Sequence, residues 1–205
     1  MRINNILAKL TNEYPDAKCM LDYQKDYQLV IAVMLSSQTT DVSVNKVTPI
    51  LFNRFSSLDE LKNASYIEVY NIIKKLGLAK KKAENVIKIA KIIADEFDYK
   101  VPNDRDKLSL LPGVGRKTIN VILSELFDED FLAVDTHVSR LAYRLGYAKE
   151  NDSALTIENK LLKVIPEGKR KSAHHLLIRH GREVCKSKNP NCSYCVINDI
   201  CNYSK

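Results

Sequence analysis

Four of the five cysteines of this chain lie close together near its C-terminus. Cys185, Cys192, Cys195 and Cys201 follow the pattern C-x6-C-x2-C-x5-C, whereas Cys19 stands alone. The N-terminal segment has no continuous apolar run followed by small residues, so it does not indicate a secretory signal, and a reducing compartment is expected. Under reducing conditions thiolates held together by short loops favour a metal centre over disulfides. The end of the chain is therefore expected to fold around a metal.

Two kinds of metal centre accept four cysteines, zinc and a 4Fe-4S cluster. A zinc ribbon usually has two well-separated C-x2-C pairs, and only Cys192 and Cys195 are paired in that way here. The spacing favours the cluster, and zinc stays open as the alternative. Lys186 and Lys188 lie between the first two ligands, where they either contact phosphate oxygens or only offset the charge of the cluster.

Length and composition favour a compact helical protein. The 205 residues correspond to one domain or two small ones at about 150 residues per domain. Six glycines and six prolines are too few for many short strands. No uncharged apolar run approaches the roughly 20 residues needed to cross a bilayer, which excludes a membrane span. The net charge of +7 suits an anionic partner such as nucleic acid, or simply a basic soluble protein.

Apolar residues recur with helical period along residues 66–76 and 79–97. In the first segment the inward face is expected to comprise Tyr66, Val69, Tyr70, Ile73 and Leu76. In the second it is expected to comprise Ala83, Val86, Ile87, Ala90, Ile93, Ala94 and Phe97. The charged residues of the second segment are expected mostly to face water, namely Lys82, Glu84, Lys88, Lys91 and Asp95. The apolar run Leu29–Leu35 fits a buried strand or a buried helix.

Residues 101–127 predict two helices joined by a tight turn. Asn103 is a good N-cap for a short first helix, which should end near Leu111 because Pro112 follows. The turn comprises Leu111, Pro112, Gly113, Val114 and Gly115. Its glycines let the backbone approach a ligand closely, and the free amides of the second helix favour an anion such as phosphate. Alternatively, the turn is only a tight connection.

Two charged residues follow at positions that suit chemistry as well as structure. Lys117 lies in the first turn of the second helix, away from its main apolar stripe, as an ordinary solvated lysine or as an amine nucleophile. Asp135 directly precedes another helical stripe, so we expect an N-cap, and a capping carboxylate can also serve as a fixed catalytic anion. His137 is interpreted as a polar helix residue rather than a base.

Together these segments resemble the endonuclease III type of DNA glycosylases, which have a helix-hairpin-helix and an iron-sulfur loop. The resemblance runs nearly end to end and includes the four cysteines. Its other anchors are MLSSQTTDVSVNK at 34–46, KKLGLAKKKAENV at 74–86, LPGVGRKT at 111–118 and VDTHVSRL at 134–141. The chain departs from common family text at Ser37, Thr39 and Ile119.

The resemblance implies a role for each matched position. Lys117 would be the amine nucleophile and Asp135 the essential carboxylate. Gln38 would fill the gap left in the duplex, and Leu78 would enter the base stack as a wedge. The hairpin 111–115 would hold a DNA phosphate, and the four C-terminal cysteines would ligate a 4Fe-4S cluster.

The implied fold is all-α and two-lobed. Residues 19–129 would form a six-helix bundle that contains the helix-hairpin-helix. Residues 1–18 and 130–205 would form a terminal lobe that contains the cluster loop 185–201. The active site would lie in the cleft between the lobes.

The implied function is base excision repair. Such an enzyme removes oxidised or damaged pyrimidines from double-stranded DNA and cleaves the abasic site by β-elimination through a lysine Schiff base. It is expected to be a cytoplasmic monomer that associates with the nucleoid through DNA and not with membranes. The alternatives are a monofunctional adenine or mismatch glycosylase of the same superfamily, a non-catalytic DNA-binding module and a zinc-stabilised structural protein. Lys117 favours the lyase, because adenine DNA glycosylases lack the nucleophilic lysine.

Overall fold

The computed structural model describes residues 2–203, and every regular element in that range is a helix. The all-α expectation is therefore confirmed. The chain divides into two compact units. Residues 20–128 form the first, here called the central unit, and residues 1–19 with 129–205 form the second, the terminal unit. No described helix is long and apolar enough to cross a membrane.

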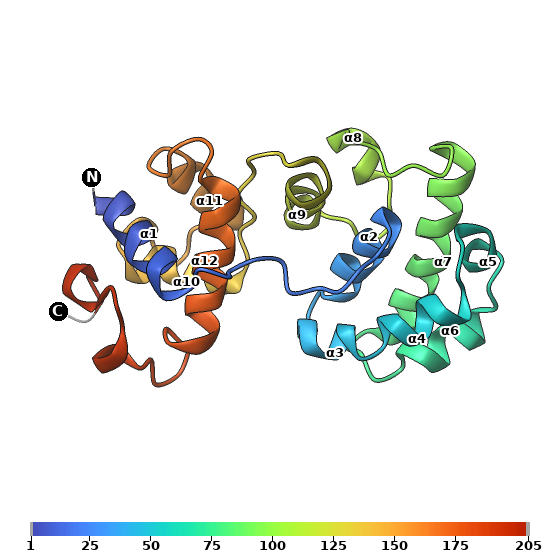
Figure 1. The fold of residues 1–205 in the computed structure, drawn as a ribbon, viewed down its shortest axis with the longest axis horizontal. Coiled ribbons are helices and arrows are strands. Elements are labelled where there is room, and N and C mark those ends of the chain that lie inside the picture. Colours follow the sequence, from blue (N-terminus) through green and yellow to red (C-terminus); the bar gives the residue numbers. More distant parts are fainter. Residues whose placement is uncertain (1, 204–205) are drawn as a thin grey trace. The chain divides into compact units, whose positions relative to one another are not determined.

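The central unit is built from the helices between residues 26 and 127 (Figure 1). They are α2 (Asp26–Leu35), α3 (Asp41–Asn45), α4 (Thr48–Arg54), α5 (Leu58–Lys62), α6 (Tyr66–Ile73), α7 (Ala79–Glu96), α8 (Arg105–Ser109) and α9 (Arg116–Phe127). Every residue of α2 from Tyr27 to Leu35 is buried, and the helix packs against α7 and α9. The ambiguous run Leu29–Leu35 is thus a helix that is covered on all sides.

The long helix α7 packs against α2, α5 and α6, so a wide arc of its surface is covered. The predicted stripe is buried at Ala83, Val86 and Ile93, as expected. The expectation that Lys82 faces water is wrong, because its exposed fraction is only 3%. In α6, Tyr66 is 39% exposed instead of buried, and its ring stacks on that of Tyr70 at a centroid distance of 6.0 Å.

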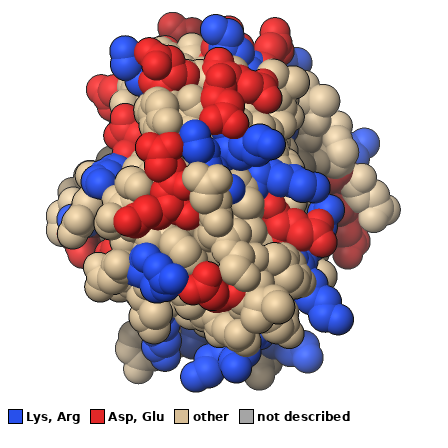
Figure 2. Space-filling view, turned by 90° about the vertical axis from the view of Figure 1, so that its right-hand side faces the viewer, with Lys and Arg blue, Asp and Glu red and all other residues tan. Residues whose placement is uncertain are grey.

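Charge is mixed over the end of the central unit where α5 and α7 lie. Figure 2 shows Lys and Arg side chains interspersed with Asp and Glu on that face. Lys62 of α5, for example, lies 3.0 Å from both Asp59 and Asp95. The net positive charge of the chain is therefore not gathered into one basic patch on this face.

The terminal unit is built from both ends of the chain. It contains α1 (Arg2–Glu13), α10 (Thr136–Arg144), α11 (Ala154–Leu162) and α12 (Arg170–Glu183), followed by two short 3-10 helices, η1 (Cys192–Tyr194) and η2 (Asn198–Ile200). Figure 1 shows α1, in blue, beside the late helices α10 and α12. Arg2 donates to the carbonyl of Ile200 at 2.7 Å, and Lys9 pairs with Asp199 at 2.7 Å. The first helix thus contacts the last part of the cysteine loop, just before Cys201.

Candidate functional site

The hairpin between α8 and α9 turns its apolar side chains inward and its backbone outward. Leu111 and Val114 are buried, whereas Gly113 and Gly115 are exposed. Gly113 has a φ of 80°, a left-handed conformation that favours glycine. Gly115 is the N-cap of α9 and offers no side-chain cap, so the first amides of that helix are not satisfied by its cap residue. An anion at the hairpin would meet backbone N–H groups.

Two side-chain contacts hold the helices on either side of the hairpin. The carboxylate of Asp104 accepts a hydrogen bond from the backbone N–H of Lys107 at 2.8 Å, so Asp104 is the N-cap of α8. The prediction of Asn103 as that cap is wrong by one residue. Arg105 donates to Oδ1 of Asn120 at 2.7 Å, which ties α8 to α9.

Lys117 lies in the first turn of α9 and is half-buried. Asn120, Val121 and Ser124 follow Lys117 at helical spacing on the same face of α9, and all three are buried. Lys117 therefore lies at the edge of a buried face of α9. It is not the ordinary solvated lysine that the sequence left as one alternative.

Gln38 and Leu78 lie near each other in the central unit, and both have left-handed backbones. Their φ angles are 52° and 58°, which for a residue with a side chain costs about 1–2 kcal/mol each. The Leu78 side chain is 60% exposed, and Gln38 is exposed as well. A Cβ built on Gly77 would lie 3.3 Å from the carbonyl oxygen of Gln38, so the two loops touch. The two residues predicted to enter a duplex are thus presented together.

Asp135 caps α10, as expected from the sequence. Its Oδ1 accepts hydrogen bonds from the backbone amides of His137 and Val138, each at 2.9 Å. The carboxylate is half-buried and is held in one orientation by these two bonds. Nδ1 of His137 lies 3.1 Å from a guanidinium nitrogen of Arg140, and burial lowers the pKa of His137. Asp135 belongs to the terminal unit, whereas Lys117 belongs to the central unit.

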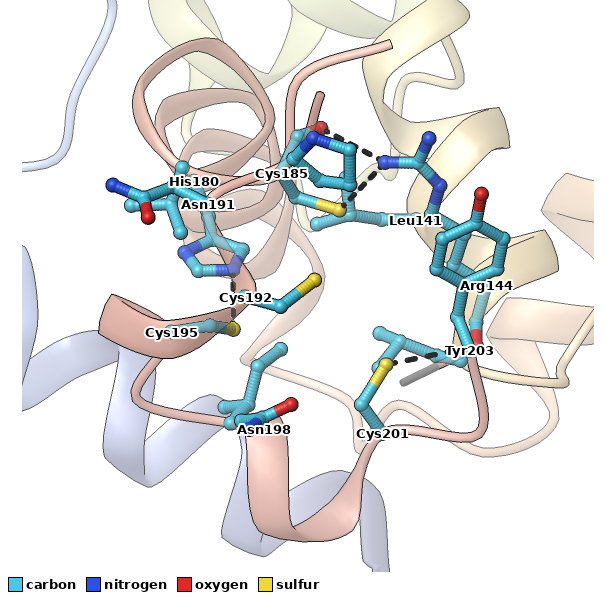
Figure 3. Close-up of a pocket in the computed structure, with 14 residues that line it drawn as sticks. Leu141, Arg144, His180, Cys185, Asn191, Cys192, Cys195, Asn198, Cys201 and Tyr203 are labelled. Carbon is cyan, nitrogen blue, oxygen red and sulfur yellow. Dashed lines mark hydrogen bonds between the residues drawn. The ribbon is translucent and has the colours of Figure 1, made fainter. Parts of the chain in front are cut away.

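The four C-terminal cysteines line one pocket in the terminal unit (Figure 3). Their sulfur atoms lie around a common space that is partly open to solvent. Much of the remaining wall is apolar, formed by Leu141, Leu145, Val184 and Ile197. Cys19 is not among the lining residues. The side chains of Lys186 and Lys188 are exposed on the adjoining loop.

Donor groups surround these thiols. The guanidinium of Arg144 donates to Sγ of Cys185 at 3.2 Å, and Nε2 of His180 lies 3.4 Å from Sγ of Cys195. The hydroxyl of Tyr14 lies 3.0 Å from Nδ1 of the same imidazole. Burial lowers the pKa of His180 to about 4 and raises the pKa of Tyr14 to about 12.

The electrostatics of the pocket fit a cationic core. Burial raises the pKa of the Cys195 thiol, and the charges of the other three cysteines raise it further. Ligation by positively charged iron or zinc would offset this repulsion. Within the described residues, no three His, Cys, Asp or Glu side chains are placed to hold a single metal ion. Four thiols line a largely apolar pocket, and the Arg144 guanidinium donates to one of the sulfurs. This donor set fits a metal centre with four cysteine ligands.

Sequence reasoning missed three polar residues that the fold buries, Lys82, Arg144 and His180. Arg144 and His180 contact cysteines that are 41 and 15 residues away along the chain. His180 lies on α12, which directly precedes the cysteine segment, and that adjacency was the available signal for it. No signal in the sequence pointed to Arg144, which lies at the end of α10.

Comparison with known proteins gives full-length similarity. Residues 31–167 match the family model described as HhH-GPD superfamily base excision DNA repair protein. Endonuclease III of Rickettsia felis is 41% identical over 201 residues, which cover 98% of this chain and 94% of the relative. Endonuclease III of Escherichia coli K12 is 40% identical over 200 residues, with coverages of 98% and 94%. A solved structure of a trapped endonuclease III–DNA covalent intermediate superposes with a TM-score of 0.94 at 39% identity, covering 98% of this chain and 95% of that one.

Proposed function

The chain belongs to the endonuclease III family of the HhH-GPD superfamily of base excision DNA repair proteins, and we propose that it is a bifunctional DNA glycosylase and abasic-site lyase. It removes damaged pyrimidines from double-stranded DNA and cleaves the resulting abasic site by β-elimination. The observation that carries this proposal is the position of Lys117, in the first turn of the helix that follows the hairpin. An amine there gives the covalent chemistry that a monofunctional glycosylase lacks.

DNA binding begins at the hairpin. The outward backbone of Gly113 and Gly115 and the amides at the start of α9 suit a phosphate oxygen, and such a contact carries no base identity. Lys186 and Lys188 add exposed positive charge on the cysteine loop. We place the enzyme in the cytoplasm, in contact with the nucleoid.

The damaged base must leave the stack before its sugar carbon can be attacked, which costs a few kcal/mol. Leu78 offers an exposed apolar side chain for the opened stack, and Gln38 offers an amide for the orphaned partner base. Gln38 and Leu78 already have left-handed backbones without DNA, and a conformation that is already formed lowers the cost of ordering when DNA binds.

Lys117 and Asp135 share the chemistry. The neutral amine of Lys117 attacks C1′ as the bond from C1′ to the base breaks, and the base leaves with the bonding electrons. The carboxylate of Asp135, fixed by two backbone amides, stabilises the positive charge that develops on the sugar. Opening of the sugar ring gives an imine between Lys117 and C1′. Loss of a C2′ proton then expels the 3′ phosphate and cuts the strand.

Cys185, Cys192, Cys195 and Cys201 would hold a 4Fe-4S cluster in the pocket of Figure 3. The bound cluster would supply iron ligation that offsets the charge of four thiolates and fixes the loop from 185 to 201. Arg144 donates to the sulfur of Cys185, and the His180 imidazole contacts the sulfur of Cys195, so these two side chains orient two of the four sulfurs.

A single assay separates the candidate functions. The purified protein is mixed with a duplex that contains one oxidised pyrimidine, and base release and strand cleavage are followed together. A bifunctional enzyme releases the base and cuts the strand without alkali. A monofunctional glycosylase releases the base but leaves the strand intact until alkali is added. A binding module does neither, and either of these outcomes would refute the proposal.

A further inference from the structure

A buried lysine lies directly beneath the loop that carries Gln38. Lys82 of α7 is 3% exposed, and its Nζ donates to the carbonyl of Ser37 at 2.8 Å and to Oγ1 of Thr39 at 2.7 Å. Both acceptors are neutral oxygens, although a buried ammonium is stabilised best by an anion. Burial accordingly lowers the pKa of Lys82.

The two acceptors flank Gln38 on either side. Gln38 has a left-handed backbone, so its loop does not follow the preceding helix α2, and the Lys82 ammonium bridges the residues before and after it. Lys82 also lies one helical turn after Leu78, since its backbone N–H donates to the Leu78 carbonyl at 3.0 Å. One side chain thus connects the position of Gln38 to the position of Leu78.

We propose that Lys82 is a positioning residue for duplex opening, which fixes Gln38 relative to Leu78 so that both enter the DNA as one unit. This inference rests on the proposed function, in which these two residues occupy the opened duplex. A head group with several donors can reach acceptors on both sides of a loop residue, which no apolar side chain can do. The Lys82 contacts hold this loop in place before DNA binds, so the entropy cost of ordering the loop does not reduce the affinity for DNA.

A purely structural role makes a different prediction from a positioning role. Apolar residues of similar volume can replace buried ionic groups with little loss of stability, and sometimes with a gain. If Lys82 served the fold alone, Lys82→Met would change stability and leave lesion recognition intact. If Lys82 positions Gln38, the variant keeps its fold and loses recognition.

The test compares Lys82→Met with a matched charge control, Lys88→Met, which removes an exposed lysine from the same helix. The measurements are affinity for a duplex with a non-cleavable abasic analogue, affinity for the undamaged duplex, and fluorescence of 2-aminopurine placed beside the analogue. We expect Lys82→Met to reduce the preference for the abasic analogue by about tenfold or more and to suppress the fluorescence rise. Lys88→Met should reduce the affinity for both duplexes by the same factor, or leave both affinities unchanged.

Two further variants keep the test independent of folding. Thr39→Val removes one acceptor of the Lys82 ammonium from a loop residue and should reduce the preference in the same direction. In a Gln38→Ala background, Lys82→Met should add less than about twofold, because its effect passes through Gln38.

The inference is overturned if Lys82→Met keeps the wild-type preference for the abasic analogue, or if it lowers the affinity for both duplexes by the same factor. It is also overturned if the double variant with Gln38→Ala loses preference by the full product of the two single effects. A wild-type protein with no preference for the abasic analogue would overturn the proposed function as well. Normal wild-type preference with an unaffected Lys82→Met would overturn this inference alone.

Discussion

The side-chain amide of Asn85 lies directly against the backbone of Gly113, so that a Cβ built on Gly113 would meet its Nδ2 at 2.6 Å. Gly113 also has a φ of 80°. Asn85 is buried, and its Oδ1 accepts no hydrogen bond within the described part of the chain. Together with Lys82, one turn earlier on α7, it stands behind the loops proposed to contact DNA. The shape of the hairpin therefore depends on a glycine at its tip and on the helix behind it.

Gly113→Ala should destabilise the protein by about 1–3 kcal/mol, because the new methyl group combines a left-handed backbone with a close contact. Denaturant unfolding measures this loss. Gly115→Ala is the matched control. Its Cβ would meet no atom within 4 Å, and its φ of −93° suits any residue, so the change should cost less than about 1 kcal/mol. Equal losses for the two variants would contradict this account.

Gly115→Ala then isolates the role of the hairpin in DNA binding. The methyl group stands where a phosphate would approach, so affinity should fall by a similar factor for damaged and undamaged duplexes. The preference for damage should remain. Unchanged affinity for both duplexes would mean that the hairpin only connects two helices.

The structural and catalytic roles of Asp135 can be separated. Asparagine caps a helix about as well as aspartate, so Asp135→Asn should leave the free energy of unfolding nearly unchanged, whereas Asp135→Ala should lose about 1 kcal/mol. Both variants lack the anion, and release of a damaged base should slow by about a hundredfold or more in each. Stability is measured by thermal unfolding and base release in single-turnover assays. If Asp135→Asn released the damaged base at the wild-type rate, the carboxylate would have no catalytic role and would serve only as the N-cap of α10.

The cysteine pocket makes a spectroscopic prediction. The purified protein should absorb broadly in the visible region, and Cys192→Ser should lose the colour together with the folded cysteine loop. Cys19→Ser should keep the colour, because Cys19 is outside the pocket. A colourless wild-type protein with one tightly bound zinc would contradict the cluster, and loss of colour in Cys19→Ser would contradict the ligand set.

Lys82 predicts a pH dependence of stability. Burial places the pKa of Lys82 in the folded protein below the value of 10.5 that it has in the unfolded chain. Between these two values the unfolded chain binds more protons, so the contribution of Lys82 to the free energy of unfolding rises with pH. Unfolding curves of the wild type and Lys82→Met should therefore diverge in favour of the wild type as pH rises toward 10.5. Parallel pH profiles would show that the ammonium is not desolvated.

Local signals predicted most of the fold and the outline of the candidate site. Helical periodicity located α7, and the cap chemistry of Asp135 located the start of α10. The cap of α8 was misplaced by one residue because Asn103 and Asp104 are both good caps, and only the backbone geometry selects Asp104. The ambiguity of Leu29–Leu35 could not be resolved locally, because complete burial removes the periodicity.

The misses have a common physical cause. Periodicity predicts one buried face per helix, but α7 is covered by several helices, and this burial extends to Lys82. The contact of Arg144 with Cys185 spans 41 residues and follows from tertiary packing, which no local pattern encodes. Tyr66 is the opposite case. It belongs to the apolar stripe of α6, but the neighbouring helices leave it exposed.

Covalent trapping on abasic DNA tests the central claim most directly, because it asks whether the amine of Lys117 forms the imine. Borohydride should reduce that imine to a stable complex with the wild-type protein. Asp135→Asn should still give some complex, because an abasic site bypasses base release. Lys117→Gln keeps a polar side chain but lacks the amine, so it should bind abasic DNA without forming a trapped complex or cutting the strand. If Lys117→Gln still cuts abasic DNA through a trappable complex, another amine is the nucleophile and the assignment of Lys117 is wrong.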